Sequence, residues 1–351
     1  MSYKETFYFI AKCLTISLEE KNREEIEIFL KTTDVDWESV VKVGTAHYVF
    51  PAIYLNFKRA DFLKYLPVEL VDYMKNITNL NRDRNTQILK QAQELNSLLL
   101  ANNITPIFLK GTSNLLAGIY DDIAERMIGD IDLLLSETDL QIAFKILKSD
   151  GYSTSKNLLN HFPEHRHYPR LVKEEKIAAV EVHKDVVREK YRNEFNFKII
   201  SEDVQPINDF SVLSFENQLS LSIIADQIND YGFELIKFSL RNAYDVFLFS
   251  KKVDTKKTIL KFDKLKSPLN CFIANCNLVF GEIDSLKFHK TKETDLYMDA
   301  FNKSFLKKSK LKFYLKSNII KFRRRFFIVC NSLFNRKHRM WLLKRIRDSI
   351  S

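Results

Sequence analysis

Two aspartates, one residue apart, begin an otherwise apolar segment of the chain. Asp130 and Asp132 lie between Gly129 and a run of three leucines. Residues i and i+2 of a strand face the same side, about 6 to 7 Å apart, so both carboxylates can reach one divalent cation, or two cations about 3.5–4 Å apart. Ile131 and Leu133 would then face the core. The spacing indicates a metal site on a strand, and a solvated strand edge is the alternative interpretation.

A third carboxylate is expected on a neighbouring strand. In the segment Ala-Val-Glu-Val-His at 179–183, alternation places Glu181 and His183 on one face and two valines on the other. Three converging acids are the arrangement that two-metal phosphoryl transfer requires. Arg126, four residues before Asp130, could neutralise a triphosphate or orient the carboxylates, and a structural ion pair is the alternative.

A candidate phosphate-binding turn lies upstream of these acids. The apolar strand predicted at 107–109 runs directly into Lys110-Gly111-Thr112-Ser113. Backbone N–H groups at the start of a helix bind phosphate, and Gly111 would let a phosphate approach closely. The hydroxyls of Thr112 and Ser113 would add hydrogen bonds, and Lys110 would add a point charge. A plain strand-to-helix turn is the other interpretation.

Histidines also gather near the third acid. They are His161, His165, His167 and His183. A hairpin turn centred on Glu174 and Glu175 would place His167 opposite Val182, on the face away from Glu181. A zinc hydrolase site is therefore disfavoured. Local hydrogen bonding, contact with a nucleotide and a solvated loop cluster remain open, and the histidine beside the third acid is the best candidate for an active-site role.

Periodicity supplies the elements that would position these residues. It predicts strands at 107–109, 129–135, 165–172 and 177–187, and helices at 67–102, 114–120, from Ser136 to about 150, from 214 onward and at 234–249. The order strand, helix, strand, helix, hairpin predicts an α/β or α+β core.

The motifs in combination resemble the polymerase-β-like nucleotidyltransferase superfamily. The segments that carry the resemblance are Phe108-Leu109-Lys110-Gly111, Arg126, Gly129-Asp130-Ile131-Asp132-Leu133-Leu134 and Val180-Glu181-Val182-His183. They are most similar to an uncharacterised bacterial nucleotidyltransferase family with an LKG…RxxxDID…EIH pattern. Residues 46–54 and 240–248 also resemble that family, so the likeness covers about residues 40–250. The usual Gly-Ser dipeptide is here Gly-Thr-Ser, and His47 precedes Tyr48 rather than Gly.

The resemblance implies both a fold and a site. The fold would be α+β, an α/β core with a mixed sheet flanked by helical N- and C-terminal regions. Asp130 and Asp132 would hold two Mg²⁺ ions, or Mn²⁺, and Glu181 would share the catalytic metal and help to activate a hydroxyl. The residues implied to bind the nucleoside triphosphate, ATP among the candidates, are Lys110, Gly111, Thr112, Ser113, Arg126 and His183.

The activity implied is metal-dependent transfer of a nucleoside monophosphate from a nucleoside triphosphate to a hydroxyl acceptor, with release of pyrophosphate. RNA, protein and small molecules are all possible acceptors, because a fold does not specify its substrate. A catalytically degenerate nucleotide- or RNA-binding module and a metal-dependent phosphohydrolase are the alternatives. The three acids argue against degeneracy, since a binding module needs no such convergence.

Composition limits the class of protein. The chain has 351 residues, of which 45% are hydrophobic and 28% charged, which excludes wholesale disorder. Four scattered cysteines, with no CxxC pair, argue against a zinc ribbon and against a disulfide scaffold. No apolar run approaches the roughly 18 to 20 residues of a membrane span, and no signal-peptide pattern begins the chain. We therefore expect a soluble, cytoplasmic protein.

The charge is unevenly distributed. Residues 301–351 contain sixteen Lys or Arg and one acid, a net +15, so residues 1–300 carry −5 of the total +10. Basic clusters interleaved with aromatic residues suit RNA or an anionic membrane surface, and a helical cap on the body is the alternative. We expect a helical region at 1–100, a nucleotidyltransferase core at 101–205, a helical region at 206–300 and a basic helical tail at 301–351.

Overall fold

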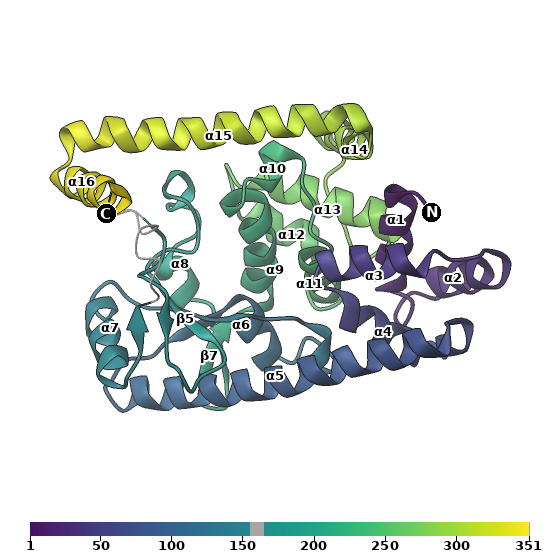
Figure 1. The fold of residues 1–351 in the computed structure, drawn as a ribbon, viewed down its shortest axis with the longest axis horizontal. Helices are drawn as coiled ribbons and strands as arrows, with labels where there is room; N and C mark the ends of the chain where they lie inside the picture. Colours follow the sequence, from purple (N-terminus) through teal and green to yellow (C-terminus); the bar gives the residue numbers. More distant parts are fainter. Residues whose placement is uncertain (155–164, 351) are drawn as a thin grey trace.

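A mixed β-sheet lies among helices that precede it, connect its strands and follow it (Figure 1). The computed structural model describes residues 1–154 and 165–350. His161 falls outside the described residues. The architecture confirms the α+β class expected from the sequence.

The chain begins with helices. They are α1 (Tyr3–Cys13), α2 (Glu20–Thr32), α3 (Trp37–Ala46), α4 (Phe50–Arg59), the 3₁₀ turn Leu63–Tyr65 and α5 (Val68–Leu100). The long helix predicted at 67–102 is confirmed as α5, with Pro67 at its N-cap. Buried residues recur every three or four positions between Ile88 and Leu99, so one stripe of α5 faces the core.

Among the described residues, seven strands form one sheet in the order β3-β4-β5-β2-β1-β7-β6. Their bounds are β1 Ile107–Leu109, β2 Asp130–Leu134, β3 Ser153–Thr154, β4 Leu171–Val172, β5 Ala179–His183, β6 Val204–Ile207 and β7 Phe210–Leu213. β1 is antiparallel to β2 and parallel to β7, while β2 is parallel to β5. The β6–β7 hairpin was not among the predicted elements, and it carries the sheet beyond the expected boundary at 205.

The register between β2 and β5 brings the two acidic motifs side by side. Asp132 pairs with Glu181, and Leu134 pairs with His183. The alternating apolar residues of both strands are fully buried, as the sequence predicted. One face of these strands therefore packs in the core, and the opposite face presents the polar side chains.

Two helices begin at other places than predicted. α6 (Lys110–Leu116) starts directly at the end of β1, so the helix predicted at 114–120 is wrong in its bounds. Lys110 makes this possible because its left-handed φ of 53° turns the chain without a linker. α7 (Leu140–Ser149) starts after a turn in which the Ser136 hydroxyl accepts a hydrogen bond from the Asp139 N–H. Ser136 therefore stabilises that turn rather than capping the helix directly.

Helices again dominate after the sheet. They are α9 (Phe215–Ile224), α10 (Gly232–Leu235), α11 (Leu240–Ser250), α12 (Thr255–Leu260), α13 (Lys266–Phe280) and α14 (Lys292–Ser304), with a π-helical turn at Ala225–Asn229. Between the strands lie the 3₁₀ turn Ile123–Glu125, before β2, and the 3₁₀ turn Glu189–Tyr191 and α8 (Phe197–Ser201), both between β5 and β6. The single helix predicted at 234–249 is wrong. Ile236 has a left-handed φ of 55°, which ends α10 and separates it from α11.

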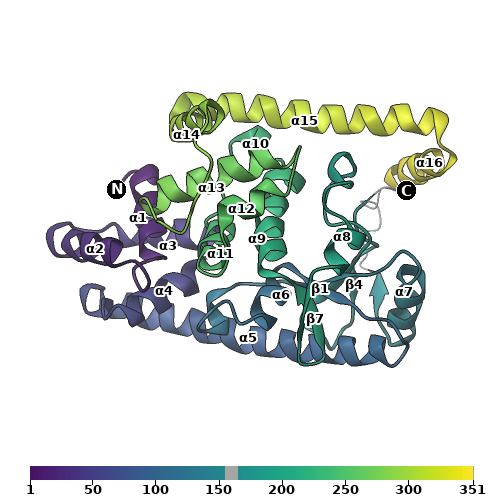
Figure 2. The same ribbon diagram turned by 180° about the vertical axis from the view of Figure 1, so that it is seen from behind.

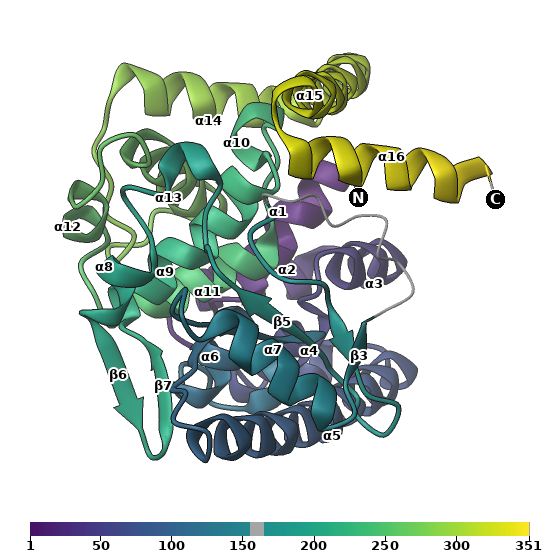
Figure 3. The same ribbon diagram turned by 90° about the vertical axis from the view of Figure 1, so that its left-hand side faces the viewer.

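The chain ends in two further helices, α15 (Lys307–Phe334) and α16 (Arg336–Ile350). α15 runs along the edge of the molecule opposite α5, and α16 turns back from its far end (Figures 1, 2 and 3). We call α15 and α16 together the basic arm. Within the part of the chain that the structure describes, no helix combines the length and the apolar character needed to cross a membrane.

A buried amide on α5 fixes the start of β5. The side chain of Gln91 donates a hydrogen bond to the Ala178 carbonyl and accepts one from the Ala178 N–H. Gln91 also donates to the hydroxyl of Tyr152. Because both backbone groups of Ala178 depend on this amide, Gln91 holds the strand that carries Glu181 against α5.

We expect Gln91→Ala to lower the free energy of unfolding by about 2–4 kcal/mol, because it leaves two buried backbone groups without partners. Urea unfolding followed by circular dichroism measures this change. Gln93→Ala, on the exposed face of the same helix, is the matched control and should change stability by less than about 0.5 kcal/mol. Equal stabilities of the two variants would contradict this role of Gln91.

Candidate functional site

Three side chains from β2 and β5 converge on the polar face of the sheet. Ligand atoms of Asp132, Glu181 and His183 all lie within 4.8 Å of one another. Nε2 of His183 lies 2.8 Å from Oδ1 of Asp132 and 3.5 Å from Oε2 of Glu181. The convergence follows from the parallel register and from alternation along both strands.

A lysine supplies positive charge beside the acids. Nζ of Lys110 donates to Oδ1 of Asp132 at 2.5 Å and lies 3.9 Å from Oε2 of Glu181. A left-handed backbone conformation costs roughly 1–2 kcal/mol at a residue other than glycine. At Lys110 this conformation accompanies a side chain that reaches the acids, so local strain occurs at the candidate site.

Burial and neighbouring cations act in opposite directions on the two carboxylates. Burial raises the pKa of Asp132, but the Lys110 ammonium and the His183 ring outweigh it and hold that pKa well below its ordinary value. Burial likewise raises the pKa of Glu181, and the hydrogen bond from His183 helps to lower it overall. Both groups are therefore ionised at neutral pH and can act as ligands for a cation.

Asp130, the other aspartate of the motif, is not part of the cluster of Asp132, Glu181 and His183. A carboxylate oxygen of Asp130 pairs with the guanidinium of Arg170, which lies immediately before β4. Asp130 does face the same side of β2 as Asp132, as alternation predicted. Its carboxylate is thus engaged by an arginine, whereas His183 completes the cluster around Asp132.

The histidines lie differently from the prediction. His167 pairs with His183 and Leu171 with Val180, so the predicted register, with His167 opposite Val182, is wrong. Between these two pairs the chain advances four residues from His167 to Leu171 but only three from Val180 to His183. The one extra residue forms a bulge. Nε2 of His167 consequently lies 3.6 Å from Oε2 of Glu181, on the same side as the cluster.

Other histidines and charges extend this cluster. The ring centroids of His165 and His167 are 4.2 Å apart, and those of His167 and His183 are 5.0 Å apart. Burial lowers the pKa of His167 to about 4, so its ring is neutral at physiological pH and offers a lone pair. A row of imidazoles therefore approaches the acids from one side.

The predicted phosphate-binding turn is tightly packed. A Cβ on Gly111 would lie 2.2 Å from Cγ2 of Ile128, so contact with this isoleucine already requires glycine at this position. The side chains of Thr112 and Ser113 are buried, and Thr112 donates to the Asp130 carbonyl. The Thr112 hydroxyl therefore connects α6 to β2, and Lys110 is the member of the motif that reaches the acids.

Arg126 lies in a buried ion pair. Its guanidinium is 3.0 Å from a carboxylate oxygen of Asp245 on α11, and both side chains are almost fully buried. Burial raises the pKa of Asp245, and the charge of Arg126 opposes this rise. The Tyr120 hydroxyl donates to the same carboxylate. Of the two sequence interpretations, these contacts favour structural pairing, which connects the segment before β2 to the C-terminal helices.

Two contacts at the candidate site were not predicted from the sequence. The pairing of Asp130 with Arg170 joins residues that are distant in sequence, and no local pattern marks Arg170 as its partner. The contact of Lys110 with Asp132 is equally long-range, although the adjacency of Lys110 to a strand end could have indicated a side chain at the sheet edge. Both contacts depend on strand order, which spacing alone does not give.

The donor set fits a divalent cation. Two ionised carboxylates and an imidazole nitrogen lie close enough to share one ion, and this combination of oxygen and nitrogen ligands is typical of Mn²⁺ or Zn²⁺, while Mg²⁺ prefers oxygen alone. Lys110 and Arg170 already balance the acids electrostatically. An ion entering the cluster would therefore compete with these cationic side chains.

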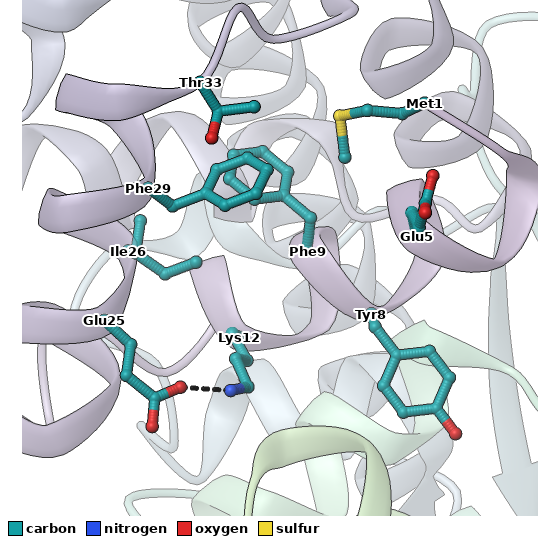
Figure 4. A pocket seen from close by; sticks show the side chains of 9 residues that line it. All are labelled: Met1, Glu5, Tyr8, Phe9, Lys12, Glu25, Ile26, Phe29 and Thr33. Atoms are coloured by element: carbon teal, nitrogen blue, oxygen red, sulfur yellow. Dashed lines mark hydrogen bonds and ion pairs between the residues drawn. The ribbon is translucent and has the colours of Figure 1, made fainter.

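A separate pocket lies between α1 and α2, away from this chemistry (Figure 4). Phe9, Ile26 and Phe29 supply much of its lining, and Lys12 pairs with Glu25 at its edge. The pocket shares no lining residue with the cluster of Asp132. The candidate functional site is therefore the polar face of β2 and β5.

A mixed sheet with carboxylates on two adjacent parallel strands defines an α+β protein with a candidate metal centre. A family model described as an uncharacterised nucleotidyltransferase matches residues 33–278, which is more than half of the chain. The chain therefore belongs to this nucleotidyltransferase family and is a transferase, as the motif resemblance implied. The matched range contains β1, β2 and β5. No curated protein and no solved structure matches the chain.

We expect Arg126→Ala to lower the free energy of unfolding by about 3–5 kcal/mol, because it leaves the Asp245 carboxylate buried without its counter-charge. Chemical denaturation measures the loss. Arg126→Met combined with Asp245→Leu should recover most of it, since the pair is then replaced by apolar groups. Arg82→Ala, which breaks a more exposed pair, is the control at about 1 kcal/mol or less. A stable Arg126→Ala protein would refute the structural role.

Proposed function

We propose that the protein transfers a nucleoside monophosphate from a nucleoside triphosphate to a hydroxyl acceptor and releases pyrophosphate. The observation that carries this proposal is the convergence of Asp132, Glu181 and His183 beside Lys110, in a chain of the nucleotidyltransferase family. Phosphoryl transfer needs little covalent chemistry from the protein, so positioning and charge neutralisation are the main requirements. The cluster offers both.

Asp132, Glu181 and His183 would hold a divalent cation, and Asp130 would join them once released from Arg170. Mg²⁺ and Mn²⁺ are the ions we propose, as one ion or as a pair. When bound, such an ion supplies charge neutralisation at the phosphate oxygens. The ion would then balance the charge of these acids in place of Lys110 and Arg170. Both side chains could then pair with the phosphates of the triphosphate instead.

In the proposed reaction, the acceptor oxygen forms a bond to the α-phosphorus, and the bond from that phosphorus to the pyrophosphate oxygen breaks. The hydroxyl proton passes to a carboxylate of the cluster. Glu181 is more exposed than Asp132 or His183, so we assign it the contact with the acceptor hydroxyl. Lys110 would neutralise the triphosphate, with Gly111, Thr112 and Ser113 shaping the backbone around it.

A metal-dependent phosphohydrolase is the second candidate. The position of His167 favours it, with Nε2 3.6 Å from Oε2 of Glu181 and the ring tilted against that of His183. Two imidazoles and two carboxylates also suit an ion that activates water. The hydrolase differs from the transferase only in the nucleophile. Both candidates therefore depend on the same acids, and the products of the reaction distinguish them.

Radiolabel transfer tests the proposed function. The protein is incubated with each α-labelled nucleoside triphosphate, Mg²⁺ or Mn²⁺, and a cell extract separated into RNA, protein and small molecules. We expect label in one fraction, and a loss of at least about 100-fold with Asp132→Asn or Glu181→Gln, since each removes a charge needed in the transition state.

Glu94→Gln is the matched control, because it neutralises an exposed carboxylate on α5 and should leave transfer unchanged. Circular dichroism confirms that each variant is folded. Label released only as free nucleotide would support the hydrolase instead. Label in no fraction, with the protein folded and metal present, would support a binding module and overturn both candidates.

Metal binding can be measured without any substrate. We expect calorimetric titration to give tighter binding of Mn²⁺ than of Mg²⁺, because His183 offers a nitrogen ligand that Mg²⁺ accepts poorly. His183→Ala should weaken Mn²⁺ binding by about 10–100-fold and Mg²⁺ binding by less. His289→Ala removes a histidine outside the cluster and serves as the control. Unchanged Mn²⁺ affinity in His183→Ala would exclude this histidine from the metal centre.

A further inference from the structure

One side of α15 is an exposed apolar stripe. The stripe consists of Leu311, Leu315, Ile319, Phe322, Phe326, Val329 and Leu333. Their spacings of three or four residues place all seven on one face of a helix. Each is 50 to 69% exposed, so no element that the structure describes covers this apolar surface. A stripe of this length is far more than the scattered apolar residues of an ordinary surface.

The stripe points away from the rest of the molecule. α15 contacts the body through its opposite side, where Lys237 lies over the ring of Phe313 and Lys316 donates to the Glu234 carbonyl of α10. At about 100° per residue, the direction midway between Phe313 and Lys316 is roughly 135° from the centre of the stripe. α15 also runs along an outer edge of the molecule in all three views (Figures 1, 2 and 3).

Basic side chains border the stripe. Residues 307–347 include fifteen Lys or Arg and no Asp or Glu. Arg323 and Arg325 project about 85° and about 75° to opposite sides of the stripe centre, and both are exposed. The arrangement is an apolar face with cationic flanks, which is the signature of a helix that lies in the interface of a membrane.

We infer that α15 binds the surface of an anionic lipid bilayer, with the stripe inserted among the acyl chains and the flanking arginines and lysines paired with headgroups. Charge complementarity selects this occupant, because anionic lipids attract clustered Lys and Arg while the apolar stripe gains from leaving water. The helix would lie parallel to the membrane plane, about 42 Å long, without crossing the bilayer.

Other occupants fit the stripe less well. RNA binds through phosphate contacts and base stacking, and five of the seven stripe residues are aliphatic side chains that provide neither. A second copy of the chain would bring two sets of fifteen cationic residues together, with no acids in this segment to pair with them. The inference does not depend on the proposed function, since it uses no residue of the site on β2 and β5.

Vesicle flotation with the full-length chain tests the inference. Phosphatidylcholine vesicles are compared with vesicles that also contain phosphatidylglycerol. We expect the protein to float with the anionic vesicles and to bind the neutral ones at least about tenfold more weakly. Leu315→Glu combined with Phe326→Glu should reduce binding to the anionic vesicles by at least about tenfold, because it places two charges in the apolar stripe.

Tyr314→Glu combined with Phe327→Glu is the matched control. It makes the same change in net charge with exposed residues of similar kind at neighbouring positions, but outside the stripe. This control should retain most of the binding, and thermal unfolding should show both variants as folded as the parent. Equal losses in the two variants would mean that charge alone drives binding, and would overturn insertion of the stripe.

Two further measurements on the parent chain complete the test. Tight, salt-sensitive binding of an RNA oligonucleotide without vesicle binding would overturn the inference in favour of RNA. A stable dimer by light scattering that Leu315→Glu with Phe326→Glu dissociates would overturn it in favour of self-association. Nucleotidyl transfer is measured separately, so its absence leaves the lipid result unaffected.

Discussion

The burial of the Asp132 carboxylate is the constraint on which the site depends. Only about 5% of Asp132 is exposed, and an ionised carboxylate removed from water needs compensating charge and hydrogen bonds. Lys110 and His183 provide them from two different elements. The start of α6, which carries Lys110, and the register of β5, which carries His183, therefore both serve to stabilise the Asp132 carboxylate. An ion that binds in the cluster would bind beside a carboxylate that these side chains already hold in position.

Local patterns accounted for most of what the sequence predicted correctly. A strand repeats every two residues, so the position of Asp132 relative to Ile131, and of Glu181 relative to Val180, could be read without knowledge of the fold. The α5 helix was equally clear, because its buried residues recur at helical spacing. The resemblance to nucleotidyltransferases then added what spacing could not, namely the class of reaction and the role of each acid in it.

The incorrect predictions share a physical cause, because contacts between residues distant in sequence determine the strand register and the ends of these elements. The register of His167 depends on a bulge that no local pattern signals, and the break at Ile236 interrupts a sequence that is otherwise typical of a helix. The β6–β7 hairpin has only weak alternation of its own, and it is stabilised by pairing with β1. Arg126 and Asp245 are more than a hundred residues apart, so their ion pair could be proposed from sequence only as one of two possibilities.

The uneven distribution of charge has a structural counterpart. Residues 1–300 carry a net charge of −5 and the buried acids of the site, whereas residues 307–347 carry fifteen Lys or Arg and no acid, so the two regions have opposite charge. α10 lies between them: Lys316 of the arm bonds to the Glu234 carbonyl, while the Glu234 carboxylate lies 3.3 Å from the guanidinium of Arg188. Arg188 follows His183 by five residues. A short chain of contacts thus connects α15 to the strand that carries Glu181, and attachment of the arm to a surface would fix the orientation of the sheet face relative to that surface.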